Sequence, residues 1–128
     1  MYLQWLCLCA NGCKTGLKQA HFISVDKLYS LPVVEKQDAK QQLSIWLEHW
    51  HRGVDQILHF YPEAAWQWVS SQDINKTLST FIGNDFAAGE GGEAHIQRVC
   101  PDLAEHFESF SQIAEVLLLP LVTLGEAK

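Results

Sequence analysis

Three cysteines near the N-terminus are the first residues whose types and spacing suggest chemistry. Cys7, Cys9 and Cys13 form a Cys-x-Cys-x3-Cys run, and Cys100 or His21 would be a fourth ligand for a structural zinc ion. Zinc sites usually place two to four residues between paired ligands, and residues two apart on a helix point about 200° away from each other. The spacing therefore favours small buried thiols, with a structural zinc module as a weaker alternative.

A second arrangement with chemical potential is the acidic-x-Lys motif of metal-dependent nucleases. It occurs here as Asp38-Ala39-Lys40, and Asp26 and Glu35 are neighbouring carboxylates in the sequence. In such enzymes the carboxylates hold Mg²⁺ and the lysine steadies the attacking water or the scissile phosphate. The motif lies at the start of a predicted helix and not on a strand, so we expect no intrinsic cleavage. A magnesium-dependent nuclease that uses Asp26, Glu35 and Asp38 is the alternative.

The most distinctive stretch is the glycine-rich segment 83–92, which Ile96-Gln97-Arg98-Val99 follows. It lacks the Gly-Lys-Ser/Thr ending of a phosphate-binding loop. We expect positive φ angles at several of its glycines, and Arg98 either pairing with Glu90 or Glu93 or contacting a partner. No residue of the segment is expected to be catalytic. The loop and interface residues that we single out are Gly89, Glu90, Gly91, Gly92 and Arg98.

The histidines and aromatic residues are better explained by packing. His49 and His51 lie two residues apart, whereas a two-histidine zinc motif on a helix needs a spacing of four. Most large aromatic side chains recur on apolar helical faces, so we expect a core there. These aromatic residues are Trp46, Trp50, Trp66, Trp68, Phe107 and Phe110.

Length and composition favour one folded domain over 1–128. Of the 128 residues 48% are hydrophobic and 19% charged, which suffices for a core. The net charge of −6 and the scattered lysines and arginines argue against a dedicated nucleic-acid surface. No unbroken apolar run reaches the roughly 18 residues of a membrane span, and no signal peptide is recognised. We therefore expect a cytoplasmic protein with reduced thiols.

The periodicity predicts an α+β fold, mostly helical with a small antiparallel β-hairpin. Alternation over 17–34 predicts two strands that turn at Asp26-Lys27. The expected helices cover 2–10, 36–52, 62–71, 73–81, a short element at 96–99, and a last helix from Asp102. Helix stops are expected at Asn11-Gly12 and Gly53, and a stop or kink at Pro120.

In this order the pieces resemble the C-terminal domain of the gamma subunit of exodeoxyribonuclease V (RecC). The resemblance covers nearly the whole chain. The sequence departs from the family at Leu58-His59, at His95 and at Cys100, where the family often has Leu-Pro, an aromatic residue and a tryptophan. The matching stretches are Leu28-Tyr29-Ser30-Leu31-Pro32, Trp46-Leu47, Arg52-Gly53, 58–66, Gly89-Glu90-Gly91-Gly92, Gln97-Arg98 and Leu118-Leu119-Pro120-Leu121.

The resemblance implies a degenerate nuclease-like domain of the PD-(D/E)xK type, with a restriction-endonuclease-like core and no catalytic residues. The helix that carries Gln-x3-Tyr in active relatives would here hold Gln42 and Trp46, as a vestige of the nuclease helix. The larger helicase-like part of the family's subunit has no counterpart in this sequence, so we expect a fragment, a remnant or a separate reading frame.

The resemblance also implies a function. The chain would be a non-catalytic module of a RecBCD-type helicase–exonuclease in double-strand break repair and recombination, acting in subunit assembly and DNA strand handling. Its partners would be the helicase and nuclease subunits, with DNA inside the complex and no membrane. No cofactor is implied, and Mg²⁺ would bind only under the nuclease alternative. A hydrophobic surface that absent domains leave uncovered is also expected.

Overall fold

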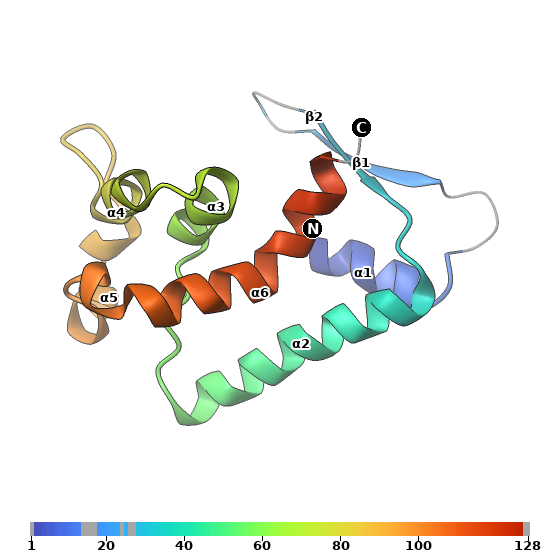
Figure 1. Ribbon diagram of the computed structural model, residues 1–128, viewed down its shortest axis with the longest axis horizontal. Coiled ribbons are helices and arrows are strands. Elements are labelled where there is room, and N and C mark those ends of the chain that lie inside the picture. The colour runs from blue at the N-terminus through green and yellow to red at the C-terminus, as the bar shows by residue number, and fades with distance from the viewer. Residues whose placement is uncertain (1, 14–17, 24, 26–27, 127–128) are drawn as a thin grey trace. The chain divides into compact units, whose positions relative to one another are not determined.

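The computed structural model describes residues 2–13, 18–23, 25 and 28–126 (Figure 1). These residues are mostly helical and include one two-stranded antiparallel sheet, so the predicted α+β class is confirmed. The elements are α1 (Tyr2–Ala10), β1 (Gln19–Ile23), β2 (Leu28–Pro32), α2 (Lys36–Asp55), α3 (Pro62–Ser71), α4 (Ile74–Ile82), the 3-10 turn η1 (Glu90–Gly92), α5 (Ala94–Val99), the 3-10 turn η2 (Leu103–His106) and α6 (Phe107–Glu126).

The chain divides into two compact units. The first unit contains Met1–His51 and Pro120–Lys128, and the second contains Arg52–Leu119. Both divisions fall inside a helix, the first near the end of α2 and the second within α6.

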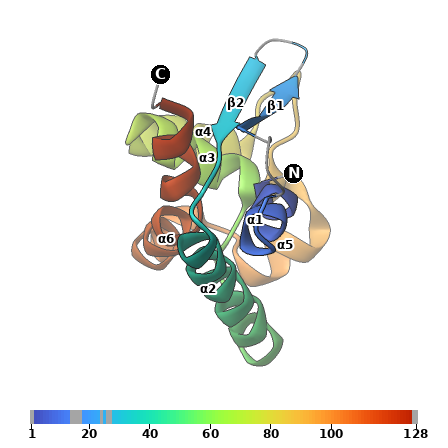
Figure 2. The same ribbon diagram turned by 90° about the vertical axis from the view of Figure 1, so that its right-hand side faces the viewer.

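The core of the first unit lies where α1, β2 and the start of α2 meet. Figure 2 shows β2 leading into α2, and α1 beside the first turns of α2. The indole Nε1 of Trp5 donates to the carbonyl of Pro32 over 2.9 Å, and the hydroxyl of Tyr2 donates to Oε1 of Gln42. These bonds satisfy polar groups while the apolar atoms are buried. The core residues are Trp5, Leu6, Cys9, Leu31, Val34 and Ala39.

The hairpin pairs its strands in the register Gln19↔Pro32 to Ile23↔Leu28. Phe22 and Tyr29 face each other across it, with ring centroids 6.1 Å apart. Such cross-strand aromatic pairs stabilise a short hairpin. The predicted turn at Asp26-Lys27 lies outside the described residues.

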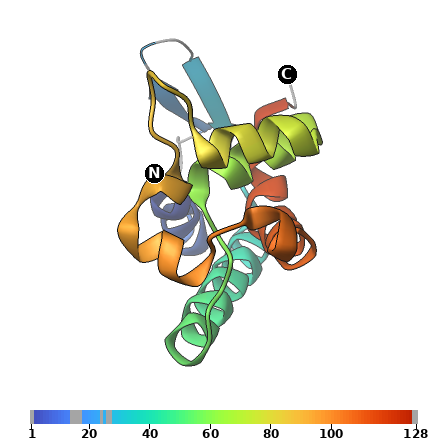
Figure 3. The same ribbon diagram turned by 90° about the vertical axis from the view of Figure 1, so that its left-hand side faces the viewer.

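The second unit is built around α3, α4 and the first part of α6. Helices α3 and α4 pack beside each other (Figure 3). Tyr61 joins several rings, because its ring centroid is 4.9 Å from that of Phe81 and 6.3 Å from that of Phe110. The buried apolar residues of this unit are Tyr61, Ala64, Ala65, Val69, Phe81, Cys100, Leu103, Phe110, Ile113, Ala114, Leu117 and Leu118.

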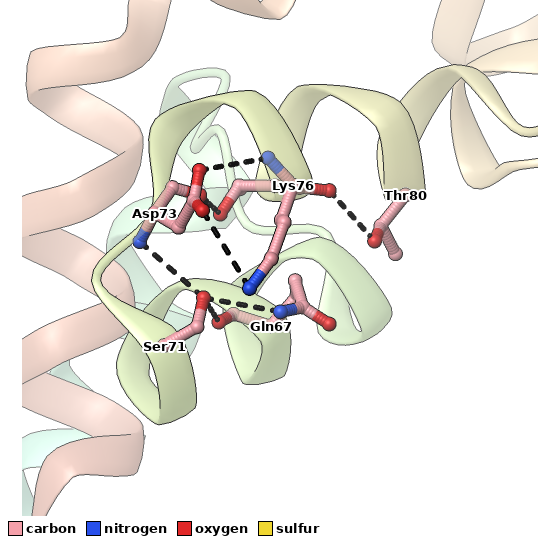
Figure 4. Close-up of polar contacts among 6 residues, drawn as sticks. Gln67, Ser71, Asp73, Lys76 and Thr80 are labelled. Atoms are coloured by element: carbon pink, nitrogen blue, oxygen red, sulfur yellow. Dashed lines mark hydrogen bonds and ion pairs between the residues drawn. The ribbon is translucent and has the colours of Figure 1, made fainter.

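Local capping explains why α3 and α4 form two helices (Figure 4). Gln72 adopts φ 53 at the end of α3, and its N–H donates to the carbonyl of Trp68. Asp73 then begins α4, because its carboxylate accepts from the N–H of Lys76 over 3.1 Å. The hydroxyl of Ser71 accepts from the N–H of Asp73 over 3.3 Å. The predicted bounds of α3 and the predicted cap at Asp73 are confirmed.

The predicted helix stop at Gly53 is wrong, and of the stop or kink expected at Pro120 the stop does not occur. Helix α2 passes through Gly53 and ends at Asp55, since Gly53 does not adopt the positive φ with which glycine terminates a helix. Helix α6 passes through Pro120 to Glu126. A proline removes one N–H from the helix, and burial of Leu117 before it and packing of Leu121 after it offset that loss.

Candidate protein interface and glycine-rich loop

Glu90 lies against the N-terminus of α3. Its carboxylate accepts from the backbone N–H of Glu63 over 3.2 and 3.1 Å, and from that of Ala64 over 3.1 Å. The residue before α3, Tyr61, supplies no side-chain cap, so these N–H groups would otherwise lack a partner. A negative charge at this end of the helix also interacts favourably with the positive end of the helix dipole. Glu90 therefore ties the glycine-rich loop to α3.

Loss of this cap should be measurable. Glu90→Ala is expected to lower the free energy of unfolding by about 1–2 kcal/mol, because two N–H groups lose a charged acceptor. Urea denaturation followed by circular dichroism measures the change. Glu93→Ala is the matched control, since the carboxylate of Glu93 lies in an exposed pair with His95. Equal losses in the two variants would contradict the role of Glu90.

The glycines of this loop serve close packing more than backbone freedom. Among Gly83, Gly89, Gly91 and Gly92 the φ angle is positive at Gly83 alone, so the expectation of several positive φ angles is wrong. A Cβ on Gly89 would meet the carbonyl oxygen of Phe81 at 2.2 Å, and one on Gly91 would meet the Phe81 ring at 2.5 Å. A Cβ on Gly92 would meet nothing within 4 Å.

The first part of the loop closes on itself. Gly83 and Ala88 form an isolated antiparallel bridge. Between them Oδ1 of Asn84 accepts from the N–H groups of Phe86 and Ala87, both over 2.9 Å. The Phe86 side chain is 99% exposed at this turn. Backbone N–H groups of this turn thus find an acceptor within the loop, while the large apolar side chain of Phe86 is exposed.

Arg98 lies exposed in the last turn of α5. In the described part of the chain, ion pairs join Lys76 to Asp73 and His95 to Glu93, and neither contains Arg98. The expected pairing of Arg98 with a glutamate is therefore wrong there, because the Glu90 carboxylate is turned to α3. Contact of Arg98 with a partner stays a prediction.

The described residues of the two metal hypotheses are not gathered into a three-ligand site. Across residues 2–13, 18–23, 25 and 28–126 there is no group of three His, Cys, Asp or Glu side chains that could hold a metal ion. Asp38 lies in the first turn of α2, as predicted, and Asp26 is outside the described residues. Cys9 and Cys100 are buried as expected of small apolar side chains, whereas Cys7 is exposed.

The vestigial-helix positions Gln42 and Trp46 both lie on α2. Gln42 is engaged in structure, because its side chain accepts from the hydroxyl of Tyr2. Burial of this hydroxyl raises the pKa of Tyr2 to about 12, so it remains a donor through the neutral range.

A stacked histidine pair fixes the segment that leads into α3. The rings of His59 and His106 have centroids 4.1 Å apart and planes inclined by 12°, and Nδ1 of His59 lies 3.1 Å from the hydroxyl of Tyr61. Burial lowers the pKa of His59, and the neighbouring His106 lowers it further. Sequence spacing gave no sign of this pair, because its members lie 47 positions apart in the chain.

Stability should fall in acid because of this pair. The pKa of His59 in the folded chain lies below its ordinary value of 6.5, so the unfolded chain binds the proton more readily. The contribution of neutral His59 to the free energy of unfolding is present above about pH 6.5, and it is lost as the pH falls towards the pKa of His59 in the folded chain. Urea denaturation between pH 8 and pH 5 should show that the free energy of unfolding falls less for His59→Phe than for the native chain. An equally reduced pH dependence in the control His95→Gln would contradict the role of His59.

An exposed apolar stripe runs along the C-terminal half of α2. Leu47, Trp50 and Val54 follow one another at steps of three or four residues, and their exposed fractions are 63%, 71% and 68%. Residues at these steps share one side of a helix. We call these three residues the α2 stripe. The expectation that Trp50 belongs to the core is therefore wrong, and Trp66, 37% exposed, also departs from it.

One of the described helical stretches, Leu103–Leu124, is long and apolar enough by length and composition to cross a membrane. Its best 18-residue window has a mean hydropathy of 1.4. A core helix of a water-soluble protein passes the same test, and Phe110, Ala114 and Leu117 are buried in the second unit. The sequence has no unbroken apolar run of this length, and the stretch passes the test because polar residues can lie between its apolar ones. The cellular location stays a prediction.

Comparison with known families identifies a domain model that matches part of the chain. The model of the RecC C-terminal domain matches residues 1–73, which include α1, the hairpin, α2 and α3. The α2 stripe lies inside the matched range, whereas Glu90 and the glycine-rich loop lie outside it. A search of the curated proteins finds no match. Because the match covers more than half of the sequence, the chain belongs to the RecC C-terminal domain family, and with it to the RecBCD-type exodeoxyribonuclease V of DNA repair.

Proposed function

We propose that this chain is a non-catalytic assembly module of a RecBCD-type exodeoxyribonuclease V, and that the α2 stripe contacts a helicase or nuclease subunit. The observation that carries the proposal is the exposure of Leu47, Trp50 and Val54 on one side of α2. Contiguous exposed apolar side chains usually mark protein–protein contacts. Tryptophan in particular is enriched among the residues that dominate interface energetics.

Electrostatics support a protein partner over direct DNA binding. The net charge is −6, and the stripe itself carries no charged side chain. A protein that neutralises DNA phosphates needs a concentration of lysine and arginine. In this proposal the module acts on DNA strands through the complex that it helps to assemble.

The proposal includes a degenerate nuclease-like origin. Asp38 and Lys40, which form the acidic-x-Lys motif, lie on α2 and not on a strand. The hydrogen bond from Tyr2 occupies Gln42, the position implied for the nuclease helix. The contact gives Gln42 a structural use, and the position of the acidic-x-Lys motif on a helix supports a non-catalytic module.

Binding of the full chain to the purified helicase and nuclease subunits tests the proposal. Trp50→Ala should weaken binding by roughly 30-fold, which corresponds to a loss of about 2 kcal/mol at a central tryptophan. Arg52→Ala is the matched control, because residue 52 is exposed on the side of α2 away from the stripe and should leave binding nearly unchanged. Biolayer interferometry or calorimetry measures both dissociation constants.

Two results would contradict the proposal. One is equal binding by Trp50→Ala and the native chain, which would remove the α2 stripe from the interface. The other is cleavage of linear DNA by the isolated chain with Mg²⁺ that disappears in Asp38→Ala, which would establish a nuclease.

A further inference from the structure

The thiols of Cys9 and Cys13 are in contact at the C-terminal end of α1. Their sulfur atoms are 3.6 Å apart. Helix α1 ends at Ala10, and Gly12, whose N–H donates to the carbonyl of Cys9 over 2.9 Å, adopts φ 76. This left-handed turn is the ordinary way in which glycine terminates a helix. It places residue 13 beside the side chain of residue 9.

The two thiols differ in access. Cys9 is 1% exposed within the core that contains Trp5, Leu6 and Leu31, whereas Cys13 is only partly buried. Burial raises the pKa of the Cys9 thiol; a backbone hydrogen bond from Val34 acts in the opposite direction, and the neighbouring Cys13 adds to the rise. Small oxidants react with the accessible thiolate of a pair, and a buried thiol reacts afterwards as the resolving partner.

We propose that Cys9 and Cys13 form a reversible disulfide when a hydroperoxide reaches the end of α1. The thiolate of Cys13 attacks the peroxide, an S–O bond forms, the O–O bond breaks, and the alcohol or water leaves with the proton. The thiol of Cys9 then attacks the sulfenic sulfur, the S–S bond forms, the S–O bond breaks, and water leaves. Both thiols lose their hydrogens, and their two electrons reduce the peroxide.

The disulfide would act on the core of the first unit. Forming the S–S bond draws the sulfur of Cys9 towards Cys13 and away from the backbone hydrogen bond with Val34. Val34 is a core residue in the connection between β2 and α2. A reducing dithiol returns the pair to the thiol state. Because the cytoplasm normally keeps such thiols reduced, the bond would form under oxidative stress.

Cys7 provides an internal reference for the experiment. It lies on the same helix and is exposed. Trypsin cleaves after Lys14, so a single peptide, Met1–Lys14, contains Cys7, Cys9 and Cys13. The full chain is treated with hydrogen peroxide and unfolded, its free thiols are alkylated with iodoacetamide, and the tryptic peptides are analysed by mass spectrometry.

The expected result is a Met1–Lys14 peptide that has lost two hydrogens and carries one alkyl group, on Cys7. Treatment with dithiothreitol before alkylation should restore three alkyl groups. Cys7→Ser should keep the peroxide-dependent loss of two hydrogens, and Cys13→Ser should abolish it and leave Cys9 alkylated. A bond to Cys7, a bond between two chains, or irreversible oxidation of Cys13 with Cys9 still alkylated would each overturn the proposal.

Discussion

Replacing Phe110 by alanine is expected to lower the free energy of unfolding of the second unit by about 3–5 kcal/mol, the largest single effect in this chain. Phe110 has no exposed surface. Its ring lies 6.3 Å from the ring of Tyr61 and 5.6 Å from that of Phe107, measured between centroids. Alanine would remove these ring contacts and leave a cavity among side chains that are already packed. The cost therefore includes both lost burial and the empty space.

Urea denaturation with near-ultraviolet circular dichroism measures the Phe110→Ala effect, because the signal reports on the packed aromatic rings. Val116→Ala is the matched control on the same helix, since Val116 is 47% exposed and its truncation leaves no buried cavity. We expect the control to change the free energy by less than about 0.5 kcal/mol. A Phe110→Ala chain with the same urea midpoint as the native chain would contradict the contribution of the Phe110 ring to the core of the second unit.

Local signals predicted most of the secondary structure. Asp73 and Pro62 act within one helical turn of the ends that they define, so their residue types alone indicate where α4 and α3 begin. Alternation of side chains likewise predicted the hairpin. A helix stop does not occur at Gly53, nor at Pro120, where a stop or a kink was expected, because the effect of these residues depends on packing farther along the chain.

The candidate site was less predictable because its contacts are not local. Glu90 caps α3 by accepting from an N–H group 27 positions earlier in the chain, and no pattern within one segment indicates such a bond. The recurrence of Trp46 and Trp50 predicted an apolar side of the helix, but periodicity does not say whether another element covers that side, and Trp50 is 71% exposed. Sequence therefore identified Glu90 and α2 as places of interest without the contacts that give them roles.

The glycines near Glu90 also show that sequence can identify a residue without the physical reason that requires it. Gly89 was singled out for conformational freedom, yet its φ is −81, which any residue adopts. What requires glycine is the approach of two backbone segments, because a Cβ there would lie 2.2 Å from the carbonyl oxygen of Phe81 and 2.5 Å from the nitrogen of Gly83. Neither contact involves a side chain that could turn away.

Gly89→Ala is accordingly expected to destabilise the second unit by about 3 kcal/mol, at the upper end for overpacking, because backbone atoms must move. At about 4 °C per kcal/mol for a chain of this size, the melting temperature should fall by roughly 12 °C. Gly92→Ala is the matched control, since a Cβ there meets no atom within 4 Å and should leave the melting temperature within about 2 °C. Differential scanning calorimetry compares both with the native chain. Equal melting temperatures for Gly89→Ala and Gly92→Ala would mean that the loop yields to a methyl group, and that the Glu90 cap does not depend on this close packing.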